Sequence, residues 1–170
     1  TYQRKYNEAR NAAQVVGFVS AGKSGIEAAS NFTLEHISNE LVQRIKAFFT
    51  DNDIEGDSVC LTIDKDLQDI ASNLMKTNKG AVVVEEVSTG RILTMVSKPD
   101  FDPSTVYQNW DSIKEDENSP LVNRATQGEY TPGSIFKIVT SVSAIRNIPN
   151  IDNFKFDCSG EADFAGQTIH

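Results

Sequence analysis

The pattern of apolar and polar positions divides the chain at about residue 57. Residues 1–57 hold one apolar run, at 12–19, followed by a Gly/Ser-rich turn. Apolar residues then recur at steps of three or four, which predicts a helix. These positions are Leu34, Ile37, Leu41, Ile45 and Phe48. A polar stretch at 51–56 ends the pattern and is typical of a linker. We therefore predict two parts, residues 1–57 and 58–170.

The second part opens with a short apolar stretch, 58–63, which predicts a strand. Asp64 follows this stretch and is a favourable N-cap for a helix from Lys65 to about Thr77. Apolar residues fall on one face of that predicted helix. They are Leu67, Ile70, Ala71 and Leu74.

A β-hairpin is the clearest strand prediction. The β-branched run at 82–84 follows Gly80, and two strands are expected at 81–87 and 91–96, joined by a turn at 88–90.

A further helix is predicted from Ser134 to about Arg146, directly after the turn Tyr130-Thr131-Pro132-Gly133. Its apolar residues recur at helical spacing, so we expect one buried side. That side comprises Ile135, Ile138, Val139 and Val142.

Composition narrows the function classes only a little. The 16 basic and 24 acidic residues give a net charge of −8, which argues against a nucleic-acid groove lined by clustered Lys and Arg.

Cys60 and Cys158 lack C-x-x-C spacing, and the apolar run around Cys60 favours a buried free thiol over a disulfide. No apolar stretch reaches the ~20 residues of a membrane helix, and no signal peptide is visible.

Ser134-Ile135-Phe136-Lys137 has S-x-x-K spacing. A serine hydroxyl is a poor nucleophile until a base removes its proton, and positions i and i+3 of a helix share a face. So short a motif also arises by chance, and Ser20 to Lys23 is a second copy. Only Ser134 follows a Pro-Gly turn and opens an amphipathic helix. We therefore predict Ser134 as nucleophile and Lys137 as general base.

A competing hypothesis comes from Gly17 to Ser24, which fits the P-loop pattern G-x-x-x-x-G-K-[ST] of nucleotide hydrolases. Two observations argue against it. Phe18 and Val19 are bulky where backbone should wrap phosphate, and the hairpin after residue 80 interrupts the strand–helix alternation of such domains. An ordinary Gly/Ser-rich turn is the simpler interpretation.

Several segments resemble class B penicillin-binding proteins, the D,D-transpeptidases that cross-link peptidoglycan. The resemblance extends from about residue 12 to residue 170, and its most specific part is the run from Tyr130 to Lys137. The other segments are Val16-Gly17-Phe18, Ser24 to Glu27, Leu61 to Asp64 with Leu67-Gln68, Gly80 to Val84, Thr89 to Leu93, Ser97-Lys98-Pro99, Phe101-Asp102-Pro103 and Asn123-Arg124-Ala125.

The resemblance implies an α+β fold, a partial transpeptidase fold of an antiparallel sheet with helices. It places the N-terminal part of the transpeptidase domain at 58–170, preceded by a small non-catalytic pedestal region at 1–57. It implies that Ser134 attacks a D-Ala-D-Ala stem peptide, that Lys137 acts as its base, and that the Ser134 backbone N–H is one oxyanion donor. β-Lactams would be trapped at the same serine, and no metal or organic cofactor is implied. The parent protein is expected at the outer face of the bacterial cytoplasmic membrane, with cell-wall synthesis partners and with an anchor outside these residues.

The sequence also departs from the family pattern. The motifs S-x-N and K-[TS]-G are expected downstream of the nucleophile, and neither occurs in residues 138–170. The K-[TS]-G strand supplies half of the family's oxyanion hole, and one such donor is commonly worth ~3–4 kcal/mol. We therefore expect an incomplete active site. A non-catalytic fragment or scaffold, or a homologue that has lost the activity, remains the alternative.

Overall fold

The computed structural model of the chain describes residues 4–7, 9–19, 22–34, 57–155 and 157–169. These residues form two compact units, Thr1–Glu129 and Tyr130–His170. The helix predicted over 34–48 lies outside the described residues beyond Leu34.

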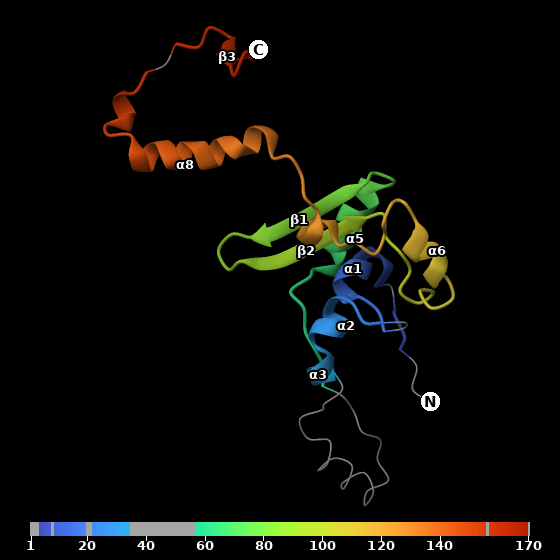
Figure 1. The fold of residues 1–170 in the computed structure, drawn as a ribbon. Coiled ribbons are helices and arrows are strands. Elements are labelled where there is room, and N and C mark those ends of the chain that lie inside the picture. Colours follow the sequence, from blue (N-terminus) through green and yellow to red (C-terminus); the bar gives the residue numbers. More distant parts are fainter. Residues whose placement is uncertain (1–3, 8, 20–21, 35–56, 156, 170) are drawn as a thin grey trace, which may run out of the picture. The chain divides into compact units, whose positions relative to one another are not determined.

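An antiparallel hairpin forms the centre of the first unit (Figure 1). Strand β1 (Gly80–Glu86) pairs with β2 (Arg91–Lys98), so that Gly80 lies opposite Lys98. The register shifts once, between Val84 and Glu85. The predicted hairpin, and with it the antiparallel α+β architecture, is confirmed.

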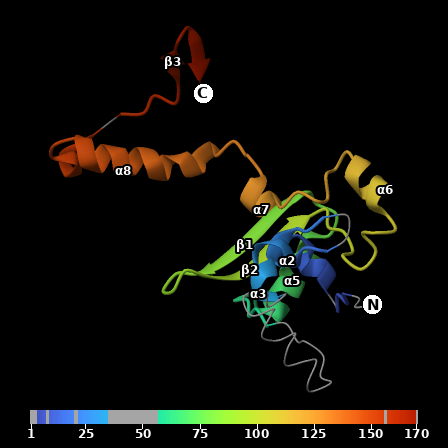
Figure 2. The same cartoon turned by 60° about the horizontal axis from the view of Figure 1, so that its bottom comes forward.

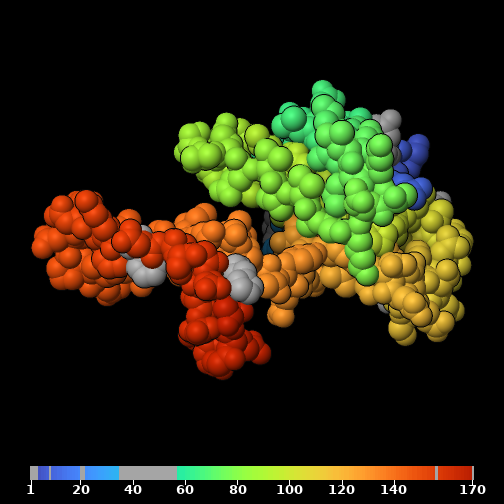
Figure 3. Space-filling model, turned by 90° about the horizontal axis from the view of Figure 1, so that it is seen from above, coloured from blue at the N-terminus to red at the C-terminus, as the bar shows by residue number. Residues whose placement is uncertain are grey.

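Helix α5 (Lys65–Met75) begins as predicted, because the Asp64 carboxylate accepts a hydrogen bond of 3.0 Å from the Leu67 N–H. It ends two residues earlier than predicted, and Lys76 at its C-cap has φ +49°. The helix packs on β2 with its polar side, since Gln68 and Ser72 are each only 2% exposed. On the apolar side of the helix, Leu67, Ile70 and Leu74 are exposed. The blue-green segment that contains α5 lies at the surface in the space-filling view (Figure 3).

The exposed side of α5 and one face of the hairpin together line an apolar groove of about 510 Å³. Leu74 of α5 and Val82 and Val84 of β1 are among its lining residues. Thr94 of β2 also lines it; this residue is fully buried, and its hydroxyl has no hydrogen-bond partner among the described residues. This groove is an apolar surface that the other described residues of the first unit leave uncovered.

The strand predicted at 58–63 is wrong. This segment is extended but forms no ladder, and only two hydrogen bonds hold its end against β2. The Asp64 N–H donates to Leu93 O at 2.8 Å, and the Thr62 hydroxyl donates to Ile92 O at 2.6 Å. Without a continuous neighbour Cys60 is exposed, so its predicted burial is wrong, whereas the free thiol favoured for Cys60 agrees with the structure.

The N-terminal segment is helical and carries half of the small core. It contains η1 (Ala9–Ala12), α1 (Ala13–Val16), α2 (Gly25–Ala29) and α3 (Asn31–Leu34). Phe18 packs edge-on against two aromatic rings, Phe101 at 5.8 Å and Trp110 at 5.9 Å between ring centroids. The segment thus belongs to the same compact unit as the hairpin, and the domain boundary at 57/58 stays a prediction.

The chain after β2, left unassigned by the sequence, carries two short helices, α6 (Trp110–Glu115) and α7 (Arg124–Gln127) (Figure 2). Arg124 is only 7% exposed, and its guanidinium donates to the carbonyls of Asn118 and Ser119. Its backbone N–H donates to the Ser97 hydroxyl at 3.0 Å. These bonds tie the loop before α7 to the end of β2.

The second unit contains η3 (Gly133–Phe136), α8 (Lys137–Asn147), η4 (Ile151–Asn153) and a small hairpin of β3 (Ala162–Phe164) with β4 (Gln167–Ile169). The helix predicted from Ser134 to about Arg146 is confirmed, with a 3₁₀ first turn. Its predicted buried side is wrong, because no helix or strand among the described residues of this unit packs along α8 (Figure 1). The exposed fractions are 69% for Ile135, 69% for Ile138, 56% for Val139 and 44% for Val142.

Across the described residues, none of the helices combines the length and the apolar character needed to cross a bilayer.

Candidate active site

Ser134 lies in the 3₁₀ turn η3, whose entry depends on one glycine. Gly133 has φ +56°, in the left-handed region that favours glycine, whereas Pro132 before it has helical dihedrals. Nothing lies within 4 Å of where a Cβ at Gly133 would be. A glycine is therefore favoured here by its backbone conformation, and not by a lack of space for a side chain.

Lys137 follows Ser134 by one turn of this 3₁₀ helix. Its backbone N–H donates to the Ser134 carbonyl, which closes the turn. Residues i and i+3 eclipse one another in a 3₁₀ helix, so the two side chains leave the backbone on the same side. The structure brings together the two residues that the sequence singled out, and their roles as nucleophile and base stay predictions.

The surroundings of this pair are open. Ser134 and Lys137 are both exposed, and in the described part of the chain no hydrogen bond joins the Ser134 hydroxyl to the Lys137 amine. An activated serine needs a base within hydrogen-bond reach and donors aimed at the developing oxyanion. Within the second unit, the predicted nucleophile and base lie on one turn, and the other described residues of this unit do not enclose them.

The geometry of the Gly17–Ser24 loop argues against a phosphate cradle. Helix α1 precedes it where a P-loop requires a strand, and α2 after it has only five residues. Gly17 has φ +81°, and a Cβ there would lie 1.9 Å from the Ser24 carbonyl oxygen. The loop is closed by its own backbone, with an isolated bridge between Val19 and Lys23. The nucleotide-hydrolase hypothesis therefore finds no support in the structure.

This loop is also held by Tyr6, whose hydroxyl accepts a hydrogen bond of 2.8 Å from the Val19 N–H. Burial raises the pKa of the Tyr6 phenol above its usual 10.0; the bond from Val19 opposes that change, and the nearby Glu27 carboxylate adds to it. The same carboxylate pairs with Arg4 at 3.3 Å. The start of the N-terminal segment is thereby bonded to the turn that follows α1.

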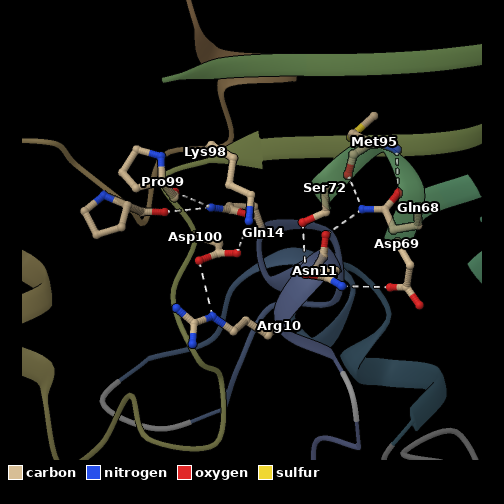
Figure 4. A network of polar contacts seen from close by, with 11 residues as sticks. Arg10, Asn11, Gln14, Gln68, Asp69, Ser72, Met95, Lys98, Pro99 and Asp100 are labelled. Atoms are coloured by element: carbon tan, nitrogen blue, oxygen red, sulfur yellow. Dashed lines mark hydrogen bonds and ion pairs between the residues drawn. The ribbon is translucent and has the colours of Figure 1, made fainter. Parts of the chain in front are cut away.

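A polar network joins the N-terminal segment to α5 and β2 (Figure 4). Gln68 donates to the carbonyls of Asn11 and Met95, at 2.7 and 2.8 Å, and accepts from the Met95 N–H at 2.9 Å. Gln14, only 9% exposed, donates to two proline carbonyls, Pro99 at 3.0 Å and Pro120 at 2.9 Å. Sequence reasoning missed this network, although a glutamine inside the apolar run at 12–19 was a signal for it.

The second part of the network centres on Asn11. Its amide donates to Asp69 at 2.8 Å, and its oxygen accepts from the Ser72 hydroxyl at 2.9 Å. The bond from Asn11, with a smaller contribution from Lys65, lowers the pKa of the Asp69 carboxyl below its usual value. The hydrogen bond from Asn11 therefore favours the ionised form of Asp69.

Comparisons with known proteins agree with the arrangement of these elements. The family described as "Penicillin binding protein transpeptidase domain" matches residues 80–165, which include Ser134 and Lys137. A second family, "Penicillin binding protein A dimerisation domain", matches residues 1–59. The chain belongs to the penicillin-binding protein transpeptidase family.

Two penicillin-binding proteins show how similar the chain is to its relatives in sequence and in structure. The peptidoglycan D,D-transpeptidase PbpA of Mycolicibacterium smegmatis is 36% identical over 161 residues, which is 85% of this chain and 33% of the relative. The structure of penicillin-binding protein A from M. tuberculosis, as an imipenem acyl-enzyme complex, has a TM-score of 0.78 at 32% identity. It covers 86% of this chain and 37% of that one.

A second solved structure aligns along nearly the whole chain. The D,D-transpeptidase domain of a peptidoglycan glycosyltransferase from Eggerthella lenta has a TM-score of 0.78 at 31% identity, and covers 99% of this chain and 37% of that one. The chain thus spans about a third of the length of the relatives it matches.

Proposed function

We propose that the chain is part of a peptidoglycan D,D-transpeptidase and carries its nucleophile, Ser134. The observation that supports this most directly is the 3₁₀ turn after Gly133, which presents Ser134 and Lys137 on one side. That turn lies inside the segment matched by the transpeptidase family. The M. tuberculosis relative is described as an acyl-enzyme complex with imipenem, so the chemistry proposed is acyl transfer through a serine.

In the proposed reaction the Lys137 amine takes the proton of the Ser134 hydroxyl as the serine oxygen attacks the carbonyl between two D-alanines. The peptide C–N bond breaks, the leaving D-alanine nitrogen receives a proton, and an acyl-enzyme ester remains. An amine from a neighbouring stem peptide then attacks the ester and releases Ser134. A β-lactam follows the same first step, but its ring opens and the acyl group stays on the serine.

Because Ser134 is exposed, the proposed reaction requires further elements around it. Apolar side chains on α8, and others in the groove beside α5, are not covered by residues of their own unit. Burial of such surfaces is the main favourable term in folding. We propose that further elements of the parent protein cover them and complete the oxyanion hole. The parent would act at the outer face of the cytoplasmic membrane, together with other cell-wall proteins.

The test is acylation by a fluorescent penicillin in the full gene product, with the adduct located by mass spectrometry. We expect the label on Ser134, its loss in Ser134→Ala, and an acylation rate about 10²–10⁴-fold lower in Lys137→Ala. Ser20→Ala is the matched control, because Ser20 belongs to the other S-x-x-K copy, and should label normally. An adduct on any other residue would refute the assignment.

The 170-residue chain provides the second arm of the experiment. If Ser134 needs elements outside these residues, the chain alone should label far more slowly than the full gene product. Absence of label in both proteins would instead favour a scaffold without transpeptidase activity.

A further inference from the structure

A polar cavity of about 450 Å³ lies within the first unit, where the N-terminal segment meets α5 and β2. Three cationic side chains from these three elements line it, Arg10, Lys76 and Lys98. Asp100 is the one carboxylate among its lining residues. The cavity belongs neither to the Ser134 turn nor to the apolar groove.

The single carboxylate is already shared by two of the cations. Asp100 accepts from the Lys98 amine at 2.5 Å and from the Arg10 Nε at 3.4 Å, and its side chain is only 11% exposed (Figure 4). Arg10 uses only its Nε in this contact. Its two terminal amino groups make no hydrogen bond to any described residue, so the edge of the guanidinium that binds oxyanions in a two-pronged manner is unoccupied.

The polar side chains just after the end of α5 also lack partners among the described residues. Lys76, Thr77 and Asn78 all line the cavity, and none of their side chains forms a hydrogen bond or ion pair with the described residues. Together they offer an ammonium, a hydroxyl and an amide. The nearby Asp69 adds little opposing charge, because it is bonded to Asn11 and paired with Lys65 at 3.1 Å.

The local excess of positive charge is unlike the rest of the chain, whose net charge is −8. General attraction of anions to this protein is therefore not expected, and anion binding here would require a specific site. The cavity volume is that of a small-molecule site and exceeds what a single water cluster needs.

From this arrangement we propose that the cavity binds an oxyanion, a phosphate or a carboxylate group, between Arg10 and Lys76, with Lys98 and Asp100 holding Arg10 in place. The ligand is either a free anion or a carboxylate carried by a peptide. Because Arg10 lies in the N-terminal segment and Lys76 at the end of α5, the bound anion cross-links the two. The proposal does not depend on acylation at Ser134.

The test follows backbone and side-chain N–H resonances of the full chain by NMR during two titrations. One probe is inorganic phosphate and the other a short peptide with two carboxylates, each at constant ionic strength set with sodium chloride. We expect saturable shifts around residues 10 and 76–78 at millimolar concentrations or below. The stronger of the two probes identifies the source of the oxyanion.

Three variants separate a site from surface charge. Lys76→Gln and Arg10→Gln should each weaken binding about tenfold, the loss expected for a charge-assisted hydrogen bond. Lys79→Gln, which removes an equal charge three residues from Lys76 but outside the cavity, should leave it unchanged. Lys76 makes no side-chain bond, so its replacement should not disturb folding. Absence of shifts up to about 20 mM, or equal weakening by all three variants, would overturn the proposal.

Discussion

Gly17 is the residue whose replacement the local geometry forbids most clearly. It has φ +81°, and a Cβ would lie 1.9 Å from the carbonyl oxygen of Ser24, which is backbone and cannot move aside cheaply. Gly17→Ala should lower the free energy of unfolding by about 2 kcal/mol or more, from dihedral strain and overpacking together. Denaturation followed by the fluorescence of Trp110, the single tryptophan, measures this free energy. The probe suits the variant because the Trp110 ring packs on Phe18, which follows Gly17 in the sequence.

Gly22→Ala is the control in the same loop. Nothing lies within 4 Å of its Cβ position, and its φ is not in the left-handed region, so we expect a change within about 0.5 kcal/mol. Equal midpoints for Gly17→Ala and the wild type would show that the loop does not close in the way described.

Asp69 makes the first unit sensitive to acid. Its pKa is lowered in the folded state, so its contribution to stability is fully present above the ordinary value of 3.8 and is lost as the pH falls through the lowered pKa. In Asp69→Asn, the free energy of unfolding should therefore fall less steeply below about pH 4 than in the wild type. The difference should stay under about 1 kcal/mol, because the carboxylate is partly exposed.

The neighbouring position Asp66 provides the comparison for this pH effect. Asp66 lies on the same helix and forms no ion pair or hydrogen bond with the described residues through its carboxylate. Asp66→Asn should therefore keep the acid slope of the wild type. If both variants lose the slope equally, the effect comes from net charge and not from the bonds to Asn11 and Lys65.

At the scale of elements, Gln68 joins three of them. It is 2% exposed and makes three hydrogen bonds to backbone groups of the N-terminal segment and β2. Gln68→Leu has similar volume but leaves those buried groups unpaired, so we expect a loss of about 2–4 kcal/mol in the free energy of unfolding. Gln108→Leu, at an exposed glutamine without such bonds, should change it by less than about 0.5 kcal/mol.

Local signals were sufficient for the elements that depend on local chemistry. The hairpin was predictable from β-branched residues flanked by glycine, and α5 from the capping carboxylate of Asp64. Residues 58–63 were wrongly predicted to be a strand, because a strand exists only when a neighbour completes its hydrogen bonds, and the sequence cannot show which neighbour is present. Residues 110–127 carry short helices too brief for a periodic pattern.

Periodicity also failed to show which face of a helix is buried. In α5 the buried residues are Gln68 and Ser72, while Leu74 is 72% exposed. A hydrophobic stripe identifies a surface suited to burial, but what covers it is set by the rest of the fold. For the candidate site, the sequence identified the pair Ser134 and Lys137, whereas the buried glutamines of the polar network have no motif.

At the scale of the whole molecule, each of the two units has apolar surface that its own residues do not cover, and this allows a test of the proposed parent protein. In the 170-residue chain Ile138 is 69% exposed, so Ile138→Ala should change the free energy of unfolding by less than about 0.5 kcal/mol. If further elements bury α8 in the full gene product, the same substitution should cost about 2–5 kcal/mol there. Thermal and chemical denaturation followed by circular dichroism compares the two proteins.

Val96→Ala serves as the control for this comparison. Val96 is 1% exposed within the first unit, so its truncation should cost more than about 1 kcal/mol in both proteins. A cost for Ile138→Ala that is equally small in the full gene product would mean that α8 stays uncovered there, against the proposed function.

Thr94 lines the apolar groove, and its side chain is costly for the stability of the first unit. Its buried hydroxyl lacks a partner among the described residues, a defect that valine, nearly the same in shape, would avoid. Selection for the stability of these residues alone would favour valine. A hydrogen-bond partner for the Thr94 hydroxyl would have to come from residues other than those described.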